Sequence, residues 1–80
     1  NYPNPFNAQT TIRFSLQKPE YVKLSVYNLA GQLVETLVNS YRSSGENAIE
    51  WDASNYSSGI YFYSLKTDEK ICTKRMLLIK

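Results

Sequence analysis

The sequence predicts a small all-β sandwich of two antiparallel sheets, with about seven strands in a single domain over residues 1–80. Several short segments alternate apolar and polar side chains, which is the period of a strand with one buried face. Turn-forming residues recur about every 8 to 12 residues, as they do in sandwiches. Aromatic residues make up 14% of the chain, and their flat side chains pack well on a pleated sheet.

Residues 10–16 and 21–28 show the alternation most clearly. The side chains expected on one face are Ile12, Phe14 and Leu16 in the first segment and Val22, Leu24 and Val26 in the second. Between the two segments, Pro19 lacks a backbone donor and disfavours helical geometry at Lys18, so a turn is expected there. The simplest arrangement of these two strands is a hairpin.

The next segment is less clear from its pattern. Residues 28–31 predict a tight turn in which Gly31 adopts the positive φ that other residues resist. A strand should follow from Gln32 to about Ser40. Its apolar residues have a spacing that fits a helix as well as a strand, and the short turn before them favours the strand. These residues are Leu33, Val34, Leu37 and Val38.

The second half of the chain predicts three more strands. A polar loop over residues 41–46 leads to a strand over 47–52, with Ile49 and Trp51 on one face. The polar stretch 52–58 should cross from one sheet to the other. Residues 60–65 are apolar or aromatic on both faces, which is typical of a central strand covered on both sides. A turn over 67–70 precedes a last strand over 71–79, and residues 4–6 can supply a short seventh strand.

Composition argues against an enzyme and against a metal or cofactor site. The chain has no His, which removes the commonest general base and metal ligand, and its carboxylates are scattered. Glu50 and Asp52 share a strand face and could meet a cation, but a solvated face is the preferred interpretation. No loop gathers the acidic residues of a calcium site, and each Gly stands alone rather than in a phosphate-binding loop. We expect no catalytic residue, cofactor or metal.

Charge and cysteine content limit the possible partners. The net charge is +2, which is too weak to predict nucleic-acid binding, although residues 66–80 hold five basic and two acidic residues, a net +3. The single Cys72 cannot form a disulfide within the chain and is expected to be a small buried side chain. No apolar run approaches the ~20 residues of a membrane span. Because the chain begins at Asn1 without a leader, we expect it to be a fragment of a larger exported protein.

The aromatic residues allow a binding hypothesis. A flat platform for sugar rings could be formed by Tyr21, Tyr27, Tyr41, Trp51, Tyr56, Tyr61 and Tyr63. A small sandwich needs such rings for its core, however, and Trp51 on a strand is more often buried. We therefore favour a core role for them.

Several blocks together resemble a known family, the C-terminal sorting domain of type IX secretion cargo. The blocks are residues 1–7 (NYPNPFN), 11–14 (TIRF), 26–28 (VYN) with Gly31 and Val34, 51–52 (WD), 59–63 (GIYFY) and 73–80 (TKRMLLIK). Their order is also similar to the immunoglobulin-like domain of flagellar hook-cap proteins. Cys72 departs from the pattern.

The resemblance implies an immunoglobulin-like sandwich that acts as a C-terminal address. In that family, the outer-membrane secretion machinery of Bacteroidetes-like bacteria reads the folded domain, which is then cleaved off or replaced by a surface anchor. The sorting-motif residues implied here are Tyr27, Gly31, Gly59, Tyr61 and Phe62 in the central blocks and Thr73, Lys74, Arg75, Met76, Leu78 and Lys80 in the closing block.

The expected function is therefore non-catalytic sorting of a parent protein through the outer membrane to the cell surface or beyond. The expected partners are the secretion machinery and the upstream domains of the parent, and the oligomeric state stays open. The last strand could present its backbone and basic side chains to a receptor by strand addition. The alternatives are an immunoglobulin-like accessory module attached to an extracellular enzyme, or a carbohydrate-binding module.

Overall fold

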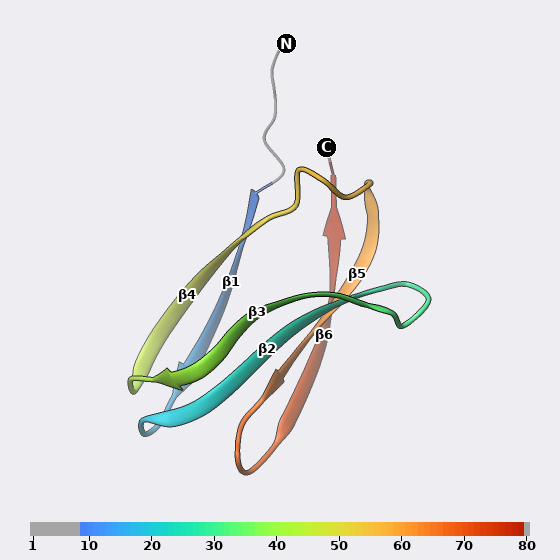
Figure 1. Ribbon diagram of the computed structural model, residues 1–80. Coiled ribbons are helices and arrows are strands. Elements are labelled where there is room, and N and C mark those ends of the chain that lie inside the picture. The colour runs from blue at the N-terminus through green and yellow to red at the C-terminus, as the bar shows by residue number, and fades with distance from the viewer. Residues whose placement is uncertain (1–8, 80) are drawn as a thin grey trace.

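The computed structural model describes residues 9–79, in which six β-strands and no helix are found (Figure 1). The strands are β1 (Gln9–Leu16), β2 (Glu20–Asn28), β3 (Leu33–Arg42), β4 (Gly45–Asp52), β5 (Gly59–Lys66) and β6 (Ile71–Leu78). The all-β class and the six main strands expected from the alternation are confirmed. The short strand expected at residues 4–6 lies outside the described residues.

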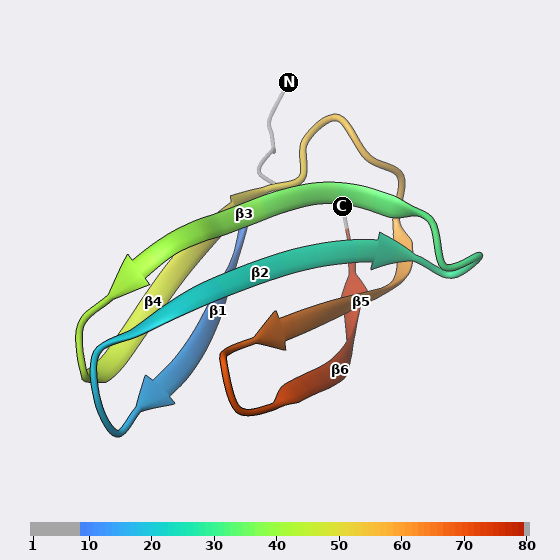
Figure 2. The same ribbon diagram turned by 60° about the horizontal axis from the view of Figure 1, so that its bottom comes forward.

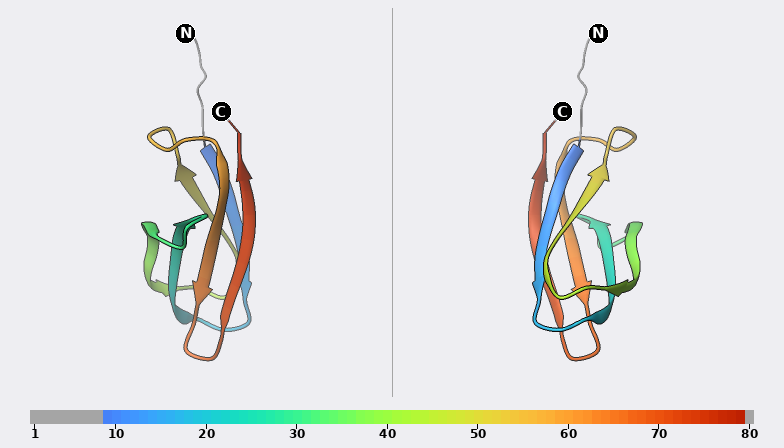
Figure 3. Two further views of the ribbon diagram at one scale, coloured as in Figure 1. Left: turned by 90° about the vertical axis from the view of Figure 1, so that its right-hand side faces the viewer. Right: turned by 90° about the vertical axis from the view of Figure 1, so that its left-hand side faces the viewer.

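The strands form two antiparallel sheets packed as a sandwich. One sheet has the order β3-β2-β5-β6, and the other pairs β1 with β4 (Figures 1 and 2). In two further views the β1–β4 pair lies against one face of the four-stranded sheet (Figure 3). In these described strands, the other face of the larger sheet is covered by no second layer.

The hairpin expected between the first two strands is wrong. β1 pairs with β4, with Thr10 opposite Trp51 and Leu16 opposite Gly45, while β2 lies in the other sheet. The turn around Pro19 therefore carries the chain from one sheet to the other. The physical reason lies in the apolar faces of β1 and β2, which pack against each other: Leu16 and Leu24 belong to the same buried cluster. A hairpin within one sheet would have placed these faces side by side instead.

Two irregularities in β3 explain its ambiguous pattern. The pairing of β2 with β3 passes from Leu24–Val38 to Ser25–Thr36, skipping Leu37, and a second shift skips Val34. Each skipped residue is a bulge, which changes the alternation of faces along the strand. Val34, Leu37 and Val38 therefore all contact the core, although a regular strand would have placed Leu37 and Val38 on opposite faces.

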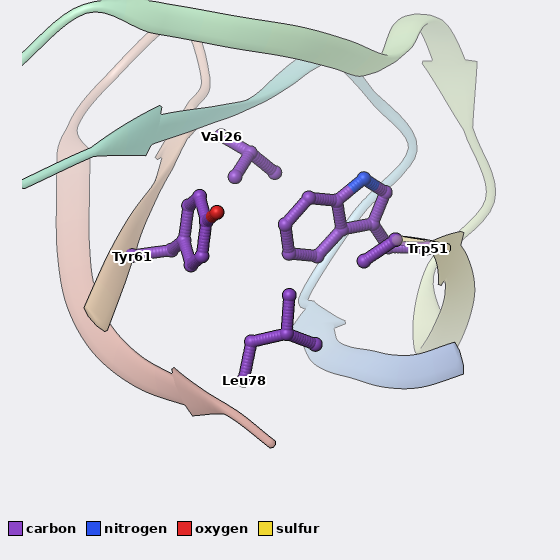
Figure 4. Packing of buried hydrophobic residues seen from close by; sticks show 5 residues of the cluster. Val26, Trp51, Tyr61 and Leu78 are labelled. Atoms are coloured by element: carbon purple, nitrogen blue, oxygen red, sulfur yellow. The ribbon is translucent and has the colours of Figure 1, made fainter. Parts of the chain in front are cut away.

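The core consists of two buried clusters that share neighbours. One cluster contains Val26, Trp51, Ala53, Tyr61 and Leu78 (Figure 4), and the other contains Ile12, Leu16, Val22, Leu24 and Val38. Met76 and Tyr63 are partly buried and pack against both clusters. Trp51 is fully buried, so its expected role in the core is confirmed.

The connection from β4 to β5 crosses between the sheets, as the sequence predicts. The backbone N–H of Ser54 donates to Asp52 Oδ1 at 3.1 Å, and that of Tyr56 donates to the Ala53 carbonyl at 3.0 Å. The crossing ends at β5, which lies between β2 and β6 and is central in its sheet. Only the inner face of β5 is covered by another sheet, whereas coverage of both faces was expected.

The described chain begins and finishes at the same end of the sandwich. β1 starts, and β6 stops, near the crossing between β4 and β5 (Figure 1). The β1–β2 loop and the β5–β6 turn lie toward the opposite end.

Candidate recognition surface on the outer sheet face

Three residues that carry the family resemblance form a row across the four-stranded sheet. Tyr27 of β2 is directly opposite Phe62 of β5, and Phe62 is directly opposite Arg75 of β6. Such directly opposite residues share one face of an antiparallel sheet. Leu33 of β3, which is 58% exposed, continues the row beyond Tyr27. Val26, which precedes Tyr27 in β2, is buried in the core. Because neighbouring residues of a strand point to opposite faces, the row lies on the uncovered side of the sheet, which we call the outer face.

The outer face is apolar on one side of this row and carries small polar side chains directly beside it on the other. Ile60 is opposite Leu77, which is 65% exposed, and this pair extends the apolar side. On the other side, Ser64 is opposite both Ser25 and Thr73, so three small hydroxyl side chains lie in line. We define the outer-face patch as Tyr27, Leu33, Ile60, Phe62, Arg75 and Leu77. An exposed apolar patch edged by polar groups is typical of an interaction surface.

Three other strand residues of the resemblance, Tyr61, Met76 and Leu78, point toward the core. Tyr61 and Leu78 are buried together against Trp51, with the Tyr61 and Trp51 ring centroids 5.4 Å apart (Figure 4). The Tyr61 hydroxyl donates to the Ser57 carbonyl at 2.7 Å and so holds the crossing segment. Met76 is opposite Tyr61 and packs against the core. These side chains hold the sheets together and are not available to a partner.

Comparison with known families assigns this chain to one of them. The chain matches the family described as the secretion system C-terminal sorting domain over residues 1–80. It belongs to this sorting-domain family. A search of curated proteins found no match, and neither did a search of solved structures. The similarity to flagellar hook-cap proteins therefore stays a prediction.

Membership of the family has consequences for the location and contacts of this sorting domain. A type IX sorting domain implies export to the cell surface or the extracellular space, and it implies interaction with the type IX secretion machinery. None of the described segments forms a helix that is long and apolar enough to cross a membrane.

The two motif glycines of the sorting domain serve its turns. Gly31 has a φ of 83°, and its N–H donates to the Asn28 carbonyl at 2.9 Å, which closes the expected turn between β2 and β3. Gly59 has a φ of 154° and begins β5 opposite Leu78. Both φ values are rarely adopted by residues with a Cβ, so the glycines are explained by backbone conformation.

The basic residues near the C-terminus are spread around β6. Arg75 lies in the outer-face patch, whereas Lys74 is opposite Tyr63 and points toward the inner side, where it is nevertheless exposed. Lys70 is exposed in the turn before β6. Lys80, the last residue of the motif, lies outside the described residues.

The expectation of a buried Cys72 is wrong. Cys72 is exposed on β6, opposite Leu65. β6 is an edge strand, and β1 belongs to the other sheet, so this stretch of β6 has a neighbouring strand only on the β5 side. The alternation of apolar residues along β6 does not show whether a strand of the other sheet covers Cys72.

The described residues contain no group of three potential metal-ligating side chains. Glu50 and Asp52 are both exposed, as the solvated-face interpretation requires. Hydrogen bonds from the side chain and backbone of Ser54 lower the pKa of Asp52. This carboxylate therefore fixes a turn.

The structure does not assemble the tyrosines into one platform. Trp51 and Tyr61 are in the core, whereas Tyr21 and Tyr41 form an exposed edge-to-face pair on the outer side of β2 and β3, with centroids 5.4 Å apart. The Tyr21 hydroxyl also donates to Asn39 Oδ1 at 2.7 Å.

A polar contact at the rim of the core was not predicted from the sequence. Glu35 Oε1 accepts hydrogen bonds from Trp51 Nε1 at 3.1 Å and from the Tyr56 hydroxyl at 3.4 Å. Glu35 lies in the irregular part of β3, beside the skipped Val34. No local signal in the sequence distinguishes this carboxylate from the other scattered acidic residues.

Proposed function

We propose that this chain is a non-catalytic sorting signal that directs its parent protein through the outer membrane to the cell surface, and that the machinery reads the outer-face patch. The observation that carries the second part is the row of Tyr27, Phe62 and Arg75. These three motif residues come from three strands and are distant in sequence, yet the pairing of β2, β5 and β6 aligns them on the uncovered face.

The division of the motif between two faces supports this assignment. Tyr61, Met76 and Leu78 contact the core, so their identity is explained by folding. The residues in the row are not needed to fill the core between the sheets. Apolar side chains on an exposed sheet face give up contact with water on binding, which supplies free energy for recognition.

The test is secretion of a reporter that carries residues 1–80 at its C-terminus, in a bacterium with a type IX system. The unaltered fusion is expected at the cell surface or in the medium. Arg75→Glu and Phe62→Ser are expected to leave the reporter in the periplasm. The matched control is Arg13→Glu, because Arg13 is an exposed arginine on β1 in the other sheet.

Deletion of residues 76–80 also tests the C-terminal end, and loss of secretion is the expected result. Because Leu78 is buried, this deletion also removes a core side chain, so the point substitutions on the outer face are the sharper test. Secretion of Arg75→Glu and Phe62→Ser at the level of Arg13→Glu would reject the outer-face patch. Failure of the unaltered fusion to leave the periplasm would reject the sorting function itself.

Position separates sorting from the role of an accessory module. A C-terminal address should fail when a folded domain is fused after residue 80, whereas a spacer between domains should tolerate that fusion. Surface display of such an internal arrangement would favour the accessory module.

A further inference from the structure

A groove opens between the two sheets at the end of the sandwich that holds the β1–β2 loop and the β5–β6 turn. Its volume is about 590 Å³. Leu16 of β1, Leu65 of β5 and Cys72 of β6 contribute to its lining. Each sheet thus supplies an apolar part of the wall. The groove lies apart from the outer-face patch, which is on the opposite side of the β5–β6 sheet.

The wall of this groove contains a carboxylate oxygen that lacks a donor. Glu20 Oε1 is buried and has no hydrogen-bond partner among the described residues. The other carboxylate of the groove, Glu69, is in an ion pair with Lys18 at 3.5 Å. A buried acceptor without a partner costs free energy, which a ligand with an N–H group would recover.

β6 borders the groove with a free backbone edge. It pairs with β5 on one side, and within residues 9–79 no strand pairs with its other side. Along such an edge, the N–H and C=O groups that point away from the sheet can bind another extended chain.

Charge selects the kind of chain that could bind at this edge. Lys70 lines the groove, and Lys74 is exposed at a position of β6 that points inward. A second copy of β6 would bring Lys74 and Arg75 close to the same residues of its partner, and an inward-pointing Lys is a known device against such edge pairing. An acidic strand would instead meet these cations.

We propose that this groove binds an extended acidic segment of a partner protein, which adds to the free edge of β6 as a further strand of the larger sheet. One small apolar side chain of the segment would contact Leu65 and Cys72, and its acidic side chains would face Lys70 and Lys74. A backbone or side-chain N–H of the segment would reach Glu20 Oε1. The inference goes beyond the sorting function and does not rest on it.

Cys72 provides the reporter for the test, because it is exposed and lines the groove. The 80-residue chain is titrated with a synthetic nine-residue peptide that has threonine at every other residue and valine and glutamate in turn at the residues between, so that both valine and glutamate lie on the face that meets Cys72 and Lys74. Alkylation of Cys72 by N-ethylmaleimide, followed by mass spectrometry, is expected to slow about tenfold at saturation. A peptide with lysine in place of glutamate should give no protection, and a glutamate peptide N-methylated at alternate residues should bind about tenfold more weakly, because it lacks edge donors.

Variants of the chain test the charges. Lys74→Glu is expected to weaken binding of the glutamate peptide about tenfold. The matched control, Lys23→Glu, should bind as the unaltered chain does, since Lys23 is an exposed lysine of the same sheet at a position between the inward-pointing Val22 and Leu24.

Three results would overturn the proposal. The first is equal protection of Cys72 by all three peptides, or unchanged binding to Lys74→Glu. The second is a Cys72 that is unreactive in the free chain and becomes reactive when residues 1–8 are deleted, because the chain would then fill its own groove. The third is protection that disappears on dilution and follows a dimer in size-exclusion chromatography, because a second copy would then be the occupant. None of these results depends on secretion, so they leave the sorting function untouched.

Discussion

The indole Nε1 of Trp51 donates a hydrogen bond to Glu35 Oε1 at 3.1 Å, which ties the largest fully buried side chain of the core to β3. The donor lies on β4 in the small sheet, and the acceptor lies on the edge strand of the large sheet. The contact therefore links the two sheets through a polar group, in addition to the apolar packing around the ring.

We predict that Trp51→Phe lowers the free energy of unfolding by about 2 to 4 kcal/mol, because it removes ring volume and leaves Glu35 without its indole donor. Urea denaturation followed by far-UV circular dichroism measures the change. The control is Tyr41→Phe on the exposed side of β3, which should stay within about 0.5 kcal/mol of the unaltered chain. Equal stability of the two variants would contradict the central role of Trp51.

The Tyr56 hydroxyl predicts a dependence of stability on alkaline pH. Burial, together with the charge of Glu35 and the hydrogen bond to it, raises the pKa of Tyr56 above its ordinary value of 10.0. A raised pKa means that the folded state favours the neutral phenol, so this stabilisation is complete below pH 10 and is lost as the pH rises through the folded pKa. Thermal unfolding between pH 8 and pH 11 should show a smaller loss of stability for Tyr56→Phe than for Tyr41→Phe. Identical losses in the two variants would contradict the role of Tyr56 in this pH dependence.

The turn between β2 and β3 should resist substitution at Gly31. Its φ of 83° is strained for a residue with a Cβ, although an added Cβ would meet no atom within 4 Å. We expect Gly31→Ala to destabilise the domain by about 1 to 2 kcal/mol through the backbone alone. Gly31→Asn should cost less, because Asn adopts positive φ more readily. Chemical denaturation measures both, and an equal cost for the two variants would point to a cause other than φ.

Cys72 should behave as an exposed thiol. We expect it to react with Ellman's reagent in the folded chain without denaturant, because it is exposed on an edge strand. Cys72→Ser should change the free energy of unfolding by less than about 0.5 kcal/mol. By contrast, a reaction that requires unfolding in urea would mean that the thiol is covered.

The sequence predicted strands best where one regular face is buried. β1 and β2 alternate without interruption, so their inner residues, such as Ile12 and Leu24, could be identified in advance. β3 was ambiguous because its bulges at Val34 and Leu37 imitate the spacing of a helix. A bulge is defined by the pairing with the partner strand, so it cannot be predicted from the residue pattern of one segment.

The predictions that were wrong concern the pairing and packing of segments that are distant in sequence, which local patterns do not determine. The hairpin of β1 and β2 was wrong because a short turn can join strands of different sheets as well as neighbours in one sheet. Cys72 was misplaced because its burial depends on how far β1 covers β6. The row of Tyr27, Phe62 and Arg75 likewise needs the pairing of three strands, so the sequence could supply its members but not their alignment.

The shared end of β1 and β6 has a mechanical consequence. A force applied between the two ends of the described chain would act across the strands rather than along them, because both strands are held at the same end of the sandwich (Figure 1). β6 would then peel from β5 one residue pair at a time, beginning at the pair of Leu78 and Gly59. Peeling breaks few hydrogen bonds at once, so this domain should unfold at low force when it is pulled by its two ends.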